Sequence, residues 1–192
     1  MNRFLRVIPL PLIPAGLGIG LLFTLAAGAQ EPAKAIQEKL AALHGRTDAK
    51  VIEIAWPYLD SRDAAVREAA RLIIEEHPFA AWRQRAFDEK STWASLEALR
   101  AVVEACPPAQ AAEVSPHLCE QITTLRIDEM NEAQQLAVLQ LTRSVFVRLG
   151  PVSADERSQI LDLWSHVNGP LTERAKAELT RLTAFIEKAP TR

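Results

Sequence analysis

Cys106 and Cys119, the only two cysteines, are the residues whose types and spacing most directly suggest chemistry. The twelve residues between them leave room for the turn between two neighbouring helices. Because the N-terminal segment predicts export, we expect a disulfide, which would stabilise the fold by roughly 3 kcal/mol in the loop-entropy model. The alternative is two ordinary core thiols, since Cys106 lies on a predicted apolar stripe. With His117 they offer only three metal ligands at no standard zinc spacing, so we expect no metal.

No motif for catalysis or cofactor binding stands out elsewhere. The four histidines occur in no H-x-x-x-H or H-E-x-x-H arrangement, and there is neither a G-x-S-x-G elbow nor a glycine-rich phosphate loop. Glu75 and Glu76 are adjacent, so on a helix they would point to different sides. We therefore predict a protein that is not an enzyme and that binds no cofactor.

Arginine and tryptophan side chains are the candidates for protein binding. Arg67 and Arg71 lie on the polar side of a predicted helix, and Trp82 is followed directly by Arg83. Tryptophan and arginine are enriched at the hot spots of protein interfaces, so these four residues are possible contacts. Two alternatives stay open: a charged stripe is usually a solvated face, and an aromatic residue is usually buried in the core.

Short helices must position these side chains. Apolar residues recur at intervals of three and four, several prolines separate the periodic segments, and no alternating strand pattern is present. Within the predicted helices, Pro57 is expected to kink its helix near the end, Pro116 to divide the helix that contains it, and Ser153 with Glu156 to form a capping box. The predicted helices are 32–43, 48–59, 61–76, 79–88, 91–106, 109–125, 131–149, 153–167 and 171–187.

One stretch, residues 57–71, resembles the HEAT repeat. That motif has a proline in its first helix, an aspartate at the turn, and a Val-Arg pair followed by small residues in its second helix. The matching residues here are Pro57, Asp60, Val66, Arg67 and Ala70. The resemblance implies a short all-α solenoid of stacked helical hairpins, in which Arg67 pairs with an aspartate of its own or the next turn. An irregular all-α bundle is the alternative architecture.

A narrower resemblance links the chain to HEAT-like segments of exported bacterial proteins that also carry haem c or quinoprotein-dehydrogenase-like domains. The similar segments are residues 76–86, 145–150 and 185–190. This resemblance implies an alternative function as an accessory subunit of a periplasmic haem c or quinoprotein redox enzyme. The chain lacks C-x-x-C-H, so it cannot attach haem by that route.

Residues 1–29 have the pattern of a signal peptide, which leaves 30–192 as one helical domain. Arg3 and Arg6 precede an apolar segment, and Ala27-Gly28-Ala29 is a small-x-small cleavage site. We expect export, to a bacterial periplasm, with an uncleaved membrane anchor as the alternative, because the apolar segment is long enough to span a bilayer.

The charge balance argues against a nucleic-acid partner. The net charge is −2, and removal of residues 1–29 leaves 20 basic and 24 acidic residues, a charge of −4. A general nucleic-acid binder shows a basic surplus instead. The sequence thus predicts an exported, non-catalytic scaffold or adaptor that binds another exported protein.

Overall fold

The protein is all-α, as the sequence predicts. The computed structural model describes residues 31–167 and 170–192, and within these ranges it has nine α-helices, four short 3₁₀ helices and no strand. The predicted signal segment, residues 1–29, lies outside the described residues. No helix in the described ranges is both long and apolar enough to cross a membrane. Residues 31–192 pack as one unit.

The helices are short and follow one another closely along the chain. The α-helices are α1 (Ala33–Ala41), α2 (Lys50–Ala55), α3 (Ala64–Glu75), α4 (Arg83–Asp88), α5 (Thr92–Ala105), α6 (Ala111–Thr124), α7 (Glu132–Arg148), α8 (Ala154–Ser165) and α9 (Glu173–Lys188). The 3₁₀ helices are η1 (Trp56–Asp60), η2 (Phe79–Ala81), η3 (Pro108–Gln110) and η4 (Ile127–Glu129).

Local side-chain caps set several helix starts. The predicted capping box of Ser153 and Glu156 is present at α8, and a second box caps α7 at Asn131. Asp63 caps α3 by accepting hydrogen bonds from the N–H groups of Ala65 and Val66 at 2.9 and 3.0 Å. Each of these caps satisfies amide groups that have no partner within the helix.

The two helical prolines act differently from one another. Pro57 lies where α2 gives way to the tighter η1, in agreement with the predicted irregularity there. The prediction that Pro116 divides its helix is wrong, because α6 runs through it without a break. Proline removes the hydrogen bond to the carbonyl four residues earlier, that of Ala112. Both residues are exposed, so water can satisfy this carbonyl.

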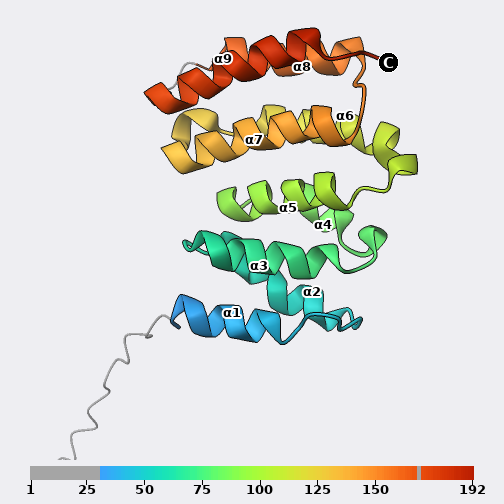
Figure 1. Cartoon of the computed structure of the whole chain (residues 1–192), viewed down its shortest axis with the longest axis vertical. Coiled ribbons are helices and arrows are strands. Elements are labelled where there is room, and N and C mark those ends of the chain that lie inside the picture. Colours follow the sequence, from blue (N-terminus) through green and yellow to red (C-terminus); the bar gives the residue numbers. More distant parts are fainter. Residues whose placement is uncertain (1–30, 168–169) are drawn as a thin grey trace, which may run out of the picture. The chain divides into compact units, whose positions relative to one another are not determined.

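The helices form two layers in residues 31–192. In one layer α1, α3, α5, α7 and α9 follow in that order, and each contacts the next (Figure 1). In the other layer α4 contacts α6 and α6 contacts α8. Each helix of this second layer also packs on the helix that follows it in sequence: α2 on α3, α4 on α5, α6 on α7 and α8 on α9. The pairs α2–α3, α4–α5, α6–α7 and α8–α9 therefore form hairpins. Neighbouring hairpins pack on each other through α3, α5, α7 and α9.

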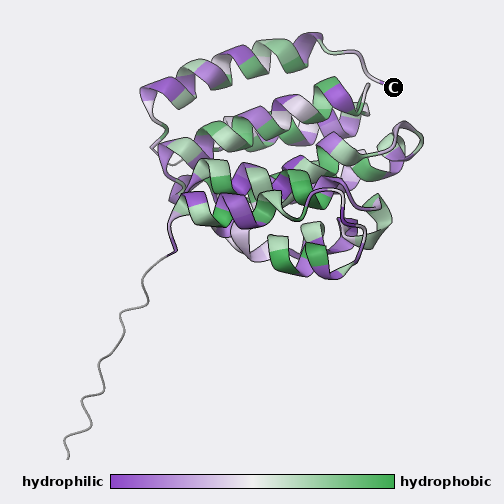
Figure 2. Cartoon of the chain, turned by 60° about the horizontal axis from the view of Figure 1, so that its bottom comes forward, coloured by the Kyte–Doolittle hydropathy of each residue, from purple (hydrophilic) through white to green (hydrophobic). Residues whose placement is uncertain are grey.

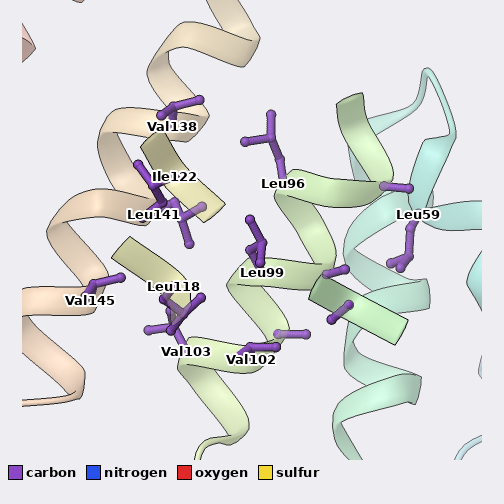
Figure 3. Packing of buried hydrophobic residues seen from close by; sticks show 14 of the residues in the cluster. Leu59, Leu96, Leu99, Val102, Val103, Leu118, Ile122, Val138, Leu141 and Val145 are labelled. Atoms are coloured by element: carbon purple, nitrogen blue, oxygen red, sulfur yellow. The ribbon is translucent and has the colours of Figure 1, made fainter. Parts of the chain in front are cut away.

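One hydrophobic cluster runs between the layers. Figure 2 shows hydrophobic and hydrophilic residues interspersed along each helix, as expected for helices that bury one stripe. In Figure 3, Leu99 and Val103 of α5 lie close to Leu118 of α6 and Val145 of α7. All four side chains are buried. The same cluster thus joins both layers.

Candidate protein-binding face

Arg67 is buried between two hairpins and does not lie on an exposed polar face. Arg67 is only 6% exposed, and its Nε donates to Oε1 of Glu97 on α5 at 3.2 Å. Nη1 donates to the carbonyl oxygens of Ser61 and Arg62, at 2.8 and 3.2 Å, in the turn before α3. The guanidinium also lies 3.6 Å from the ring centre of Trp93. The expected aspartate partner is therefore corrected to a glutamate of the next hairpin.

Arg71 extends the same network one turn further along α3. The residue is 4% exposed, its Nε lies 3.6 Å from Oε2 of Glu97, and it hydrogen-bonds Glu75. Burial raises the pKa of Glu75, and the charge of Arg71 acts in the opposite direction. Glu97 therefore lies between two arginines of α3, and this ion-pair network joins α3 to α5.

Trp82 and Arg83 also have partners within the protein. Trp82 is 1% exposed, its Nε1 donates to the carbonyl of His77 at 3.3 Å, and its ring packs edge-on against Phe79 with centroids 5.4 Å apart. Arg83 is half-buried, donates to Gln110 at 3.0 Å and pairs with a glutamate of α6. The possible role of these four residues as exposed contacts is corrected for Arg67, Arg71 and Trp82, which are buried, and burial is the alternative that was open for Trp82. Arg83 joins α4 to η3 and α6.

The cysteines are free thiols in place of the predicted disulfide. Cys119 is fully buried, and burial, followed by the charge of Glu156, raises its pKa to about 12. Cys106 is only partly buried at the end of α5, where burial raises its pKa and Arg83 and Glu113 are the nearby charges. The two thiols thus have different neighbours, and the core-thiol alternative holds fully for Cys119 alone.

Two adjoining hollows lie on the exposed side of the layer that contains α5, α7 and α9. The first, about 250 Å³, lies between α5 and α7, and the second, about 270 Å³, lies between α7 and α9. Gln140 and Arg143 of α7 line both hollows, so the two adjoin at this helix. We call this surface the arginine groove; its exposed arginines are Arg100 of α5, Arg143 of α7 and Arg174 of α9.

None of these three arginines forms an ion pair with a residue in the described parts of the chain. The carboxylates that line the groove are already paired with other arginines: Glu97 with Arg67, and Glu178 with Arg181. The groove therefore presents three exposed arginines that form no ion pair in the described chain, beside leucine side chains of α7 and α9. Such a surface is suited to carboxylates.

A larger hollow, about 560 Å³, lies between the end of α6, η4 and the end of α8. Its polar lining includes Asp162 and His166, which pair with each other at 3.2 Å. Residues 168 and 169, which follow directly on its lining residue Val167, lie outside the described chain. In the described residues, no group of three or more histidine, cysteine, aspartate and glutamate side chains is placed to hold a metal ion.

Sequence reasoning did not single out Arg100, Arg143 and Arg174. The intervals between them, 43 and 31 residues, are unequal, and no sequence pattern joins them. Comparison with known proteins found no family model, no curated protein and no solved structure that matches the chain.

Proposed function

We propose that the chain is an exported, non-catalytic scaffold of HEAT-like helical hairpins that binds another protein along α5, α7 and α9. The observation that carries the proposal is the arginine groove. It is a polar and apolar surface on three neighbouring helices, and its three arginines form no ion pair in the described chain.

The arrangement of the helices supports a short solenoid as the architecture. Each helix of the α3, α5, α7 and α9 layer contacts the next, and the HEAT-like turn at Asp60 leads into α3. A hairpin alone would leave one apolar stripe exposed to water, and stacking on its neighbours buries that stripe. Buried charged side chains such as Arg67 and Glu97 join neighbouring hairpins, so their role is structural.

The proposed location is outside the cytoplasm, and the proposed partner is another exported protein. Both rest on the signal-like pattern of residues 1–29. The narrower resemblance makes an accessory subunit of a haem c or quinoprotein redox enzyme the alternative. In that case the scaffold would bind the redox partner without any chemistry of its own.

Site-specific photo-crosslinking tests the proposal. The photo-reactive residue benzoylphenylalanine would replace Gln140 in the groove, or Gln159 on α8 as the matched control, in the full-length chain expressed in cells. Both glutamines are exposed, but Gln159 lies against α6 and away from the groove. We expect one defined crosslinked protein from position 140 and none from position 159. The absence of a crosslink at 140, from a chain shown to be helical, would contradict the proposal, and a haem-containing product would favour the accessory-subunit alternative.

A further inference from the structure

We propose that the arginine groove recognises an acidic segment of the partner whose carboxylates are spaced to meet three successive helices. This inference rests on the proposed function, because it takes the groove as the binding face. It adds the chemistry and the spacing of what is bound.

The three guanidinium groups have no carboxylate within ion-pair distance in the described chain. Arg143 has one aromatic neighbour, with its guanidinium carbon 5.2 Å from the ring centre of Phe185. Burial raises the pKa of Glu75 and the charge of Arg100 opposes this rise, but Glu75 is bonded to Arg71. A guanidinium offers a planar set of donors that matches a carboxylate, so each of these arginines can donate hydrogen bonds to one acidic side chain.

The acidic groups around the groove already form ion pairs with other arginines. Glu104, near Arg100 on α5, pairs with Arg148 at 2.7 Å. The groove carboxylates Glu97 and Glu178 are paired as described above. Although the chain beyond residue 29 carries a net charge of −4, three arginines and only two carboxylates line the groove. On a protein with a net negative charge, a surface lined by more arginines than carboxylates favours binding of an acidic segment there over binding elsewhere on the surface.

The spacing of the helices bears on the spacing of the bound carboxylates. Packed helices lie roughly 8–10 Å apart, so the axes of the three helices that carry these arginines are separated by about that interval. A polyproline II segment rises about 3.1 Å per residue with three residues per turn, which places every third side chain on one face at intervals of about 9 Å. The bound segment of the partner is therefore extended and acidic, with a glutamate or aspartate at every third position. The hollow beside Leu136, Leu139 and Leu182 would take its apolar residues.

A protein segment fits these observations better than a nucleic acid does. A nucleic acid carries phosphates at short, regular intervals and would extend beyond the groove, where exposed acidic side chains such as Glu132 and Glu173 would repel it. A short segment with widely spaced carboxylates would meet the three arginines and leave those acidic groups in water.

Fluorescence anisotropy with a labelled twelve-residue peptide tests the inference. The probe is four Glu-Pro-Pro units, which hold the polyproline II conformation and place one carboxylate per turn. Two control peptides contain four Gln-Pro-Pro units, or four adjacent glutamates followed by eight prolines. We expect the probe to bind the full-length chain more tightly than either control, by at least threefold over the clustered glutamates, and to weaken as salt is added.

The groove variant would combine Arg100→Gln, Arg143→Gln and Arg174→Gln. The matched control variant would combine Arg46→Gln, Arg62→Gln and Arg126→Gln, which removes the same charge from exposed positions outside the groove. We expect the groove variant to lose at least tenfold in affinity for the probe and the control variant to lose less than twofold. Circular dichroism would check that both variants remain helical.

Three results would overturn the inference. These are equal loss of affinity in both variants, equal binding of the Gln-Pro-Pro peptide, and tighter groove-dependent binding of a fifteen-residue thymidine oligonucleotide or of phosphatidylglycerol vesicles. If no acidic peptide binds while position 140 still crosslinks a protein, the scaffold function stands and the acidic segment is wrong. If position 140 crosslinks nothing, the proposed function itself fails.

Discussion

The Nε atom of Arg67 on α3 and the Oε1 atom of Glu97 on α5 lie 3.2 Å apart in the interior between two consecutive hairpins. The same arginine bonds the turn before its own helix, so a single side chain fixes both the hairpin and its neighbour. An ion pair in this position orients the two hairpins. Its removal from one side leaves a buried charge with one fewer partner.

Arg67→Ala should therefore lower the free energy of unfolding by about 3 kcal/mol, the lower part of the range for breaking a buried ion pair, because Arg71 still faces Glu97. Urea unfolding followed by circular dichroism at 222 nm would measure the change. Arg100→Ala, on the exposed face, serves as the control and should change stability by no more than about 0.5 kcal/mol. A loss below about 1 kcal/mol for Arg67→Ala would show that the network does not hold the hairpins together.

Trp82→Ala should destabilise the fold by about 3–5 kcal/mol, because it leaves a cavity in the core where the indole ring packs on Phe79. Leu72→Ala is the matched control, since Leu72 is one of the exposed large apolar residues and its loss should cost little. Thermal unfolding of the two variants would separate these cases. Similar melting temperatures for both variants would contradict the buried position of Trp82.

The thiols should react at very different rates in the folded chain. Burial raises the pKa of Cys119 to about 12, so almost no reactive thiolate forms there at pH 8, whereas Cys106 is partly exposed. With a chromogenic disulfide reagent and no reductant, we expect at most one thiol to react in the native chain and two to react in guanidinium chloride. Detection of no thiol in denaturant, followed by two after reduction, would show that the cysteines form a disulfide after all.

Glu75 and Glu76 are adjacent, yet their carboxyl groups should titrate on opposite sides of the ordinary value of 4.5. Burial raises the pKa of Glu75. The backbone N–H of Gly45, and then the side chain of His44, donate to Glu76 and lower its pKa. Carbon-detected NMR titration of the side-chain carboxyl carbons would show the order directly, and coincident midpoints would contradict it.

The lowered pKa of Glu76 also has a predicted effect on stability. A carboxyl whose pKa is lower in the folded state stabilises the fold above its unfolded pKa of 4.5, and this contribution is lost as the pH falls through the folded pKa. Glu76→Gln should therefore remove some of the acid sensitivity below pH 4.5 and leave the pH dependence between 6 and 8 unchanged. Glu53→Gln, an exposed glutamate for which no such hydrogen bonds to backbone exist in the described chain, is the control. Acid unfolding followed by circular dichroism at 222 nm would compare the two variants. Equal acid sensitivity in both would contradict the role of Glu76.

The sequence by itself determined the all-α class and most helix limits, because both depend on neighbours within a few residues. The box of Ser153 and Glu156 forms within one turn, and a tighter helix replaces α2 at Pro57, as local chemistry requires. Pro116 is an exception, since whether proline ends a helix depends on its exposure and on the packing of the rest of that helix.

Only the tertiary structure decided which charged residues are buried in ion pairs and which are exposed without one in the described chain. Arg67 and Arg100 are both arginines on helices of the same layer, and their local sequences do not reveal that one is buried against Glu97 and the other is exposed. Likewise, the arginine groove gathers Arg143 and Arg174 from different helices at unequal intervals. Ion pairing and exposure depend on residues 30 or more positions away, so no local pattern could have identified the groove.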